Sequence, residues 1–202
     1  MTPPPPVTPL ERFRLSTPKP LLIGFLRAAI EGCRAARVAA GHYGEERAVD
    51  AIPALRRLEV EMRLAALTRP PGFKVLIRRN PSTTYTEFSA SGVVLTGTTR
   101  THEVSWVAPA RYRKLLAETA QQALWVQPKS VDTVYGLLVY GGAWNATIPS
   151  VSIAFPTISG HLLSAQIDLV AEYPEVVAEY LPVEEAEVVV QPAVALKKKK
   201  AE

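Results

Sequence analysis

The residues of this chain that could take part in chemistry are mainly basic and aromatic side chains in its first two thirds. Arginine and lysine occur there in three short clusters, and aromatic residues such as Tyr85, Trp106 and Tyr112 lie in the same region. Basic side chains bind phosphate groups, and aromatic rings beside arginine can stack on bases. The residues predicted to form a nucleic-acid-binding surface are Arg56, Arg57, Arg78, Arg79, Arg111, Arg113 and Lys114.

A second interpretation of these clusters is that arginine is the preferred cation of the chain. Before the lysine run at 197–200 there are 15 arginines and 4 lysines, and no known RNA-binding signature accompanies them. Three of the cations, Arg111, Arg113 and Lys114, fall in the first turns of an expected helix, where they oppose the helix dipole. That unfavourable placement hints at an anionic partner.

Residues suited to nucleophilic, metal or acid–base chemistry are few and scattered. Cys33 falls in an alanine-rich helical pattern, so we expect a buried and unreactive thiol. The three histidines, at positions 42, 102 and 161, form no ligand spacing, and nothing in the sequence pairs Asp132 with Asp168. Phosphate-loop, dinucleotide-binding and nucleophile-elbow patterns are absent from the sequence. We therefore expect no metal, no cofactor and no catalytic residue.

The net charge of +4 conceals a segregation of charge along the chain. Residues 1–130 contain 19 basic and 10 acidic side chains, whereas residues 131–196 contain 8 acidic and no basic ones. The closing residues 197–202 add four lysines and one glutamate. Such segregation predicts either a charge match within one chain or complementary surfaces on different copies, which would guide their association.

Two amphipathic helices must position the first basic cluster, and we expect them at residues 21–42 and 50–67. Apolar residues recur at three- and four-residue steps in both. We expect Asp50 as the N-cap of the second helix and Pro53 in its first turn. Its apolar stripe is predicted at Leu55, Leu58, Met62 and Ala65 or Ala66. Small residues in the first helix allow close contact with the second, which predicts a helical hairpin.

Beyond residue 73 the period of the sequence changes from helical to alternating, which predicts a mainly antiparallel sheet. One further helix is expected at 109–124, between the two halves of the sheet. Strands are expected at 73–79, 83–88, 92–97, 101–107, 131–144, 150–156 and 161–173. The strand at 131–144 is too apolar to have a solvent-exposed face.

Both ends of the chain differ in composition from the middle. Residues 1–20 hold seven prolines, and we expect a flexible arm without helix or central strand. Residues 175–202 combine alternating valine and glutamate with the lysine tail, which predicts an extended acidic arm, either as an exposed edge strand or as a strand added to another chain's sheet. A single α+β domain is expected over 21–174, with the hairpin at 21–68 and the sheet and helix at 73–174.

These patterns favour a non-enzymatic structural or assembly protein that makes homo-oligomeric or large-complex contacts, for example a virion or particle subunit. Nucleic-acid binding through the basic clusters is the alternative, and a small enzyme with an unrecognised site is the second alternative. No secretory leader or transmembrane segment is apparent in the sequence. We therefore expect an intracellular (cytoplasmic) or virion location, with a homo-oligomer or larger assembly as partner.

Overall fold

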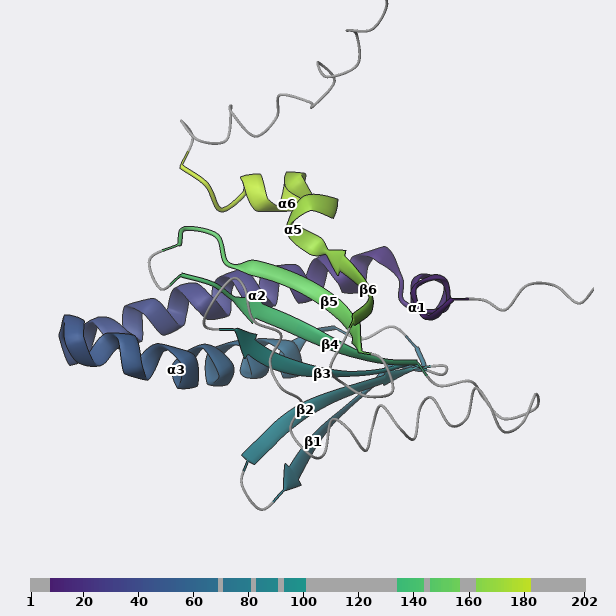
Figure 1. Cartoon of the computed structure of the whole chain (residues 1–202), viewed down its shortest axis with the longest axis horizontal. Coiled ribbons are helices and arrows are strands. Elements are labelled where there is room, and N and C mark those ends of the chain that lie inside the picture. The colour runs from purple at the N-terminus through teal and green to yellow at the C-terminus, as the bar shows by residue number, and fades with distance from the viewer. Residues whose placement is uncertain are drawn as a thin grey trace, which may run out of the picture.

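The fold is an α+β arrangement of helices covering a six-stranded sheet, as predicted (Figure 1). The computed structural model describes residues 8–68, 71–80, 83–90, 93–100, 134–143, 146–156 and 163–182. The expected strand at 101–107, the expected helix at 109–124 and the C-terminal arm beyond Pro182 lie outside these residues.

The proline-rich N-terminal segment contains a helix, α1 (Pro9–Ser16), so the prediction that residues 1–20 exclude helix is wrong. Thr8 caps α1: its hydroxyl accepts a hydrogen bond from the Glu11 amide, and the Glu11 carboxylate accepts one from the Thr8 amide at 2.9 Å. Pro9 stands in the first turn, where its missing N–H costs nothing. The ring of Phe13 is fully buried against Phe155, with centroids 5.3 Å apart, and this contact anchors the helix.

The helical hairpin is formed by α2 (Lys19–Ala40) and α3 (Glu45–Ala66), joined by a short 3-10 turn, η1 (Gly41–Tyr43). Gly44 follows with φ +75°, a conformation that glycine adopts without strain, and it takes the N-cap position of α3. The second helix therefore begins five residues earlier than expected.

The two helices approach most closely where Gly32 of α2 faces Val60 of α3. A Cβ atom at position 32 would lie 2.5 Å from Cγ2 of Val60 and 2.7 Å from its Cα, so only glycine fits. The expectation that small residues in α2 allow close packing is confirmed at this contact.

The buried stripe of α3 is not the one predicted. The side chains that face the core are Ala48, Ile52, Arg56, Val60 and Leu64, one helical turn apart. Of the predicted stripe, Leu58 and Met62 are instead 56% and 60% exposed. Two apolar stripes run along α3, and the buried one was hidden in the sequence because Arg56 interrupts it. The close approach of Gly32 to Val60 fixes which stripe faces inward.

The six strands lie in the order in which they occur in the chain. They are β1 (Lys74–Asn80), β2 (Thr83–Ala90), β3 (Val93–Arg100), β4 (Val134–Gly141), β5 (Ser150–Pro156) and β6 (Leu163–Asp168). All neighbours are antiparallel except β3 and β4, which are parallel. Parallel neighbours need a crossover connection, whereas antiparallel neighbours can be joined by a hairpin.

The main core lies between the hairpin and one face of the sheet. Phe25 of α2 packs edge-on against Phe88 of β2, with ring centroids 5.2 Å apart, among Leu26, Leu95 and Leu138. A smaller buried cluster occupies the opposite face, around Tyr135, Leu137, Val139 and Ala154. Every side chain of β4 is buried, which confirms the prediction that this strand has no solvent-exposed face.

The last strand is shorter than the predicted 161–173, because the chain turns into two short helices, α5 (Leu169–Glu172) and α6 (Pro174–Ala178). The Asp168 carboxylate accepts hydrogen bonds from the Val170 and Ala171 amides at 3.0 and 3.2 Å and so caps α5. This local cap overrides the alternating pattern. Residues 175–182, expected as part of an extended arm, form α6 and a turn that pack on the core.

Candidate functional site

The acidic C-terminal helices neutralise the basic face of α1 and α2. Ion pairs join Arg14 to Glu172 at 2.8 Å, Lys19 to Glu175 at 3.7 Å and Arg27 to Glu179 at 2.5 Å. The segregation of charge along the sequence is therefore resolved within one chain over these residues. The other possibility was complementary charge between copies. Such a contact can depend only on charged residues that do not belong to these three ion pairs.

Tyr180 completes the same contact. Its hydroxyl donates to the Glu31 carboxylate at 2.7 Å, and its backbone carbonyl accepts from Arg34 at 2.6 Å. The Arg34 guanidinium also lies over the ring, 5.4 Å from the centroid. Burial, followed by the neighbouring Glu31 carboxylate, raises the pKa of Tyr180, so the hydroxyl stays protonated and remains a donor.

Arg56, the first residue of the predicted nucleic-acid surface, lies inside the protein and is 4% exposed. Its guanidinium donates to the carbonyls of Gly142 and Ala143 at 2.8 and 2.9 Å, just after β4. Arg37 of α2 donates to the carbonyl of Ala146 in the same loop. Burial lowers the pKa of Arg56. Arg56 therefore ties α3 to the loop, and these bonds use donors that a phosphate would need.

The loop after β4 begins at two glycines, Gly141 and Gly142, that have positive φ angles. The two glycines have φ values of +141° and +111°. Because L side chains rarely adopt this conformation, the glycines let the chain turn its carbonyls toward Arg56.

Of the other predicted site residues, those that the structure describes lie on two different elements. Arg57 is exposed on α3, and Arg78 and Arg79 are residues of β1, opposite Tyr85 and Thr84 in register. The remaining three, Arg111, Arg113 and Lys114, lie outside the described residues. Phosphate contact by these six side chains stays a prediction.

The structure describes three of the side chains that could take part in catalysis: Cys33, Asp168 and His42. Cys33 is 2% exposed, which confirms the prediction of a buried thiol, and burial raises its pKa to about 11. Asp168 is the helix cap described above, and His42 is exposed in η1. Within the described ranges, no three His, Cys, Asp or Glu side chains gather to hold a metal ion.

The feature that the sequence analysis missed is an exposed apolar stripe on α3. It consists of Ala54, Leu58, Met62 and Ala66, which we call the outer stripe. Residues four apart lie on one face of a helix, and the outer stripe spans about 18 Å at ~1.5 Å per residue. Leu58 and Met62 carry this signal in the sequence, but a helical apolar period by itself predicts a buried face rather than an exposed one.

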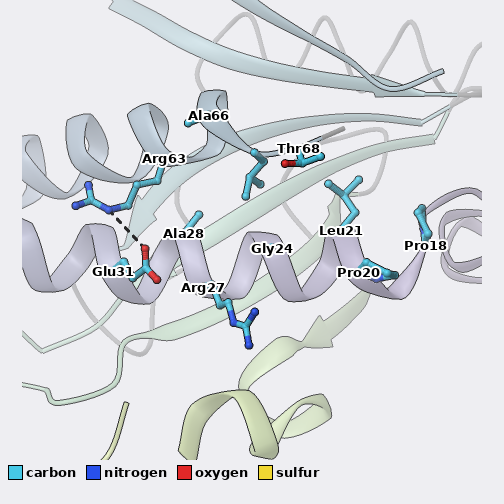
Figure 2. Close-up of a pocket in the computed structure, with 11 residues that line it drawn as sticks. Pro18, Pro20, Leu21, Gly24, Arg27, Ala28, Glu31, Arg63, Ala66 and Thr68 are labelled. Carbon is cyan, nitrogen blue, oxygen red and sulfur yellow. Dashed lines mark ion pairs between the residues drawn. The ribbon is translucent and has the colours of Figure 1, made fainter. Parts of the chain in front are cut away.

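The outer stripe leads into a groove of about 710 Å³ between α2 and the end of α3 (Figure 2). Ala66 belongs to both, and Leu21, Gly24, Ala28 and Leu67 give the groove an apolar surface.

Three charged side chains line the same groove, and each has an ion-pair partner: Arg27 pairs with Glu179, and Glu31 pairs with Arg63. Figure 2 shows Arg63 of α3 reaching toward Glu31 of α2, with Arg63 Nε and Glu31 Oε2 4.0 Å apart. Arg63 also pairs with Glu59 at 2.6 Å. An apolar partner could therefore enter without leaving a new unpaired charge.

Comparison with protein-family models, with curated proteins and with solved structures finds no match to this chain. Among the described residues, no helix combines the length and the apolar character needed to cross a bilayer.

Proposed function

We propose that this protein is a non-enzymatic assembly protein that associates with further copies of itself, or within a larger complex, through the outer stripe and the adjoining groove. The observation that carries the proposal is the exposure of Leu58 and Met62 on consecutive turns of α3. Large apolar side chains at this spacing form a continuous strip, and strips of this kind characterise helices that dock against a partner.

The surroundings of the outer stripe support this proposal. The groove adds apolar area at one end of the strip, and the charges on it already have partners on the protein. Apolar contact surrounded by satisfied polar groups is the usual composition of an interface core and its rim. The setting of the assembly, an intracellular complex or a virion, stays a prediction.

Light scattering over a range of protein concentrations at low and high salt tests this proposal. The wild type is expected to exceed the 22.0 kDa monomer mass as concentration rises. Met62→Lys and Leu58→Lys, made singly, should each weaken self-association by about tenfold, because covering a half-exposed Leu or Met is worth ~1–2 kcal/mol. Lysine is a good helix former, so α3 should persist.

Leu15→Lys is the matched control, because Leu15 is 83% exposed on α1, outside the outer stripe and the groove. It should leave the measured mass unchanged. A wild type that remains a monomer at every concentration and salt level would refute self-association. Equal effects of Leu15→Lys and Met62→Lys would show that the outer stripe is not the contact.

A further inference from the structure

The two edge strands of the described sheet differ in how they are protected against pairing with another strand. At the β6 edge the pairing with β5 is irregular at Phe155 and Pro156, and α5 begins directly after Asp168. Bulges, prolines, covering helices and charged side chains, lysine above all, are devices by which proteins block sheet edges. Both features make the β6 edge short and irregular, which disfavours the addition of a further strand there.

The β1 edge has no bulge and no proline in the described structure, and its charged side chains are the device that it carries. β1 pairs with β2 without interruption over all seven of its residues, and no other described strand pairs with it (Figure 1). Ile77, in its middle, is 70% exposed, whereas Val75, two residues earlier, packs against the main core. A long and regular edge with an exposed β-branched residue is a template for one more strand.

The charge of β1 indicates what that strand would carry. Its seven residues include three cations, Lys74, Arg78 and Arg79, and no acid. The chain itself contains a segment of opposite charge, residues 183–190 (VEEAEVVV), with three glutamates, four valines and no basic residue. β-Branched residues favour strands, and opposite charges on adjacent strands attract.

The position of Pro182 decides whether this segment can reach β1 of its own chain. Residues 179–182 follow α6, which lies beside α2 and α5 on the β6 side of the sheet (Figure 1). From β6 to β1 there are five interstrand steps of ~4.8 Å, or about 24 Å. Crossing that distance would use about seven extended residues. Only about one of the eight would then remain to pair, which is too few for a strand, so we expect the pairing between copies.

We propose that residues 183–190 of one copy add an antiparallel or parallel seventh strand to β1 of a second copy. This inference rests on the proposed assembly function and adds a second contact to it. Main-chain hydrogen bonds along β1 would supply affinity, and the lysine and arginines of β1 facing Glu184, Glu185 and Glu187 would set specificity. The valines would cover Ile77.

Disulfide trapping between two differently tagged full-length copies tests the pairing. Copies with Ile77→Cys are mixed with copies with Val189→Cys, oxidised and separated without reductant. A mixed disulfide between the two tags is expected. Native Cys33 is buried and does not compete. Leu15→Cys in place of Ile77→Cys is the control for random collision, and an equal yield from it would overturn the proposal.

Charge reversal supplies the second arm of the test. Lys74→Glu with Arg78→Glu should lower the yield of mixed disulfide roughly tenfold, since each reversal replaces an exposed attraction worth ~0.2–1 kcal/mol by a repulsion. Adding Glu185→Lys and Glu187→Lys to the other copy should restore it. A yield indifferent to these charges would contradict the proposed pairing.

The outcomes separate this proposal from the assembly function itself. Met62→Lys could abolish oligomers while the disulfide yield at Ile77→Cys equals that of the Leu15→Cys control. The outer stripe would then be an interface, and the proposed pairing of residues 183–190 with β1 would be wrong. If the wild type never exceeds monomer mass and no trapping occurs, both fail.

Discussion

Replacing Gly32 by alanine should destabilise the protein although alanine is the better helix former. The added Cβ would lie 2.7 Å from both Cα and N of Val60, and real Cβ contacts are rarely shorter than about 3.4 Å. The two helices must therefore separate by about 0.7 Å at their crossing. Overpacking of this kind costs typically ~1–3 kcal/mol, whereas the gain in helix propensity is at most ~1 kcal/mol. We expect a net loss of about 1–2 kcal/mol in the free energy of unfolding.

Urea denaturation followed by circular dichroism measures this loss. Gly41→Ala is the matched control, because Gly41 has helical backbone angles and a Cβ there would contact nothing within 4 Å. It should leave stability unchanged or raise it slightly. The clash at position 32 involves backbone atoms, so adding Val60→Ala should not restore stability. A Gly32→Ala protein as stable as the wild type, or rescued by Val60→Ala, would refute this account of the crossing.

Three further perturbations probe the anchoring contacts. Arg56→Ala should lower the free energy of unfolding by ~2–3 kcal/mol, because the buried Gly142 carbonyl and the partly buried bond to the Ala143 carbonyl lose their donor, whereas Arg57→Ala should change it by less than ~0.5 kcal/mol. Cys33, with its pKa raised to about 11 from 9.0, should hold about a hundredfold less thiolate at pH 8 than an unfolded chain, so Ellman's reagent should react fully only in denaturant. Hydrogen bonds from the Thr8 amide and hydroxyl lower the pKa of Glu11 below 4.5, so its contribution to the stability of α1 is present above the unfolded pKa and lost as pH falls through the folded one. Glu11→Gln should reduce this loss in acid titrations followed by circular dichroism.

The fold class was predictable because hydrophobic period is a local property of the sequence. The sequence predicts the helical hairpin and the first five strands, β1 to β5, with most of their bounds within a few residues. The errors occurred where a single polar side chain decides the local structure. Thr8 with Glu11 starts a helix in a proline-rich segment, and Asp168 ends a strand whose alternation continues. In both places capping outweighs the pattern that surrounds it.

The candidate site was less predictable, because period alone does not say which of two apolar stripes faces inward. On α3 the choice depends on the complementary shape of α2, where Gly32 receives Val60. It depends also on Arg56, whose charged group is buried against carbonyls from a loop 86 residues away. Tertiary contacts of this kind leave no local trace, and so the exposed face of Leu58 and Met62 appeared in the sequence as a buried one.

The segregation of charge now bears directly on assembly. Of the acidic residues between 131 and 196, Glu172, Glu175 and Glu179 pair with the basic face of α1 and α2, and Asp168 caps a helix. The acidic charge that remains is concentrated at 184–187, directly after the last described residue. The described residues offer no ion pair to Lys74, which lies at the opposite edge of the sheet. Because the internal match is already made at the β6 side, the remaining acidic segment is best matched by the β1 edge of another copy. Charge that appears as one asymmetry in the sequence thus includes a part that closes the fold, and we propose that the rest joins copies.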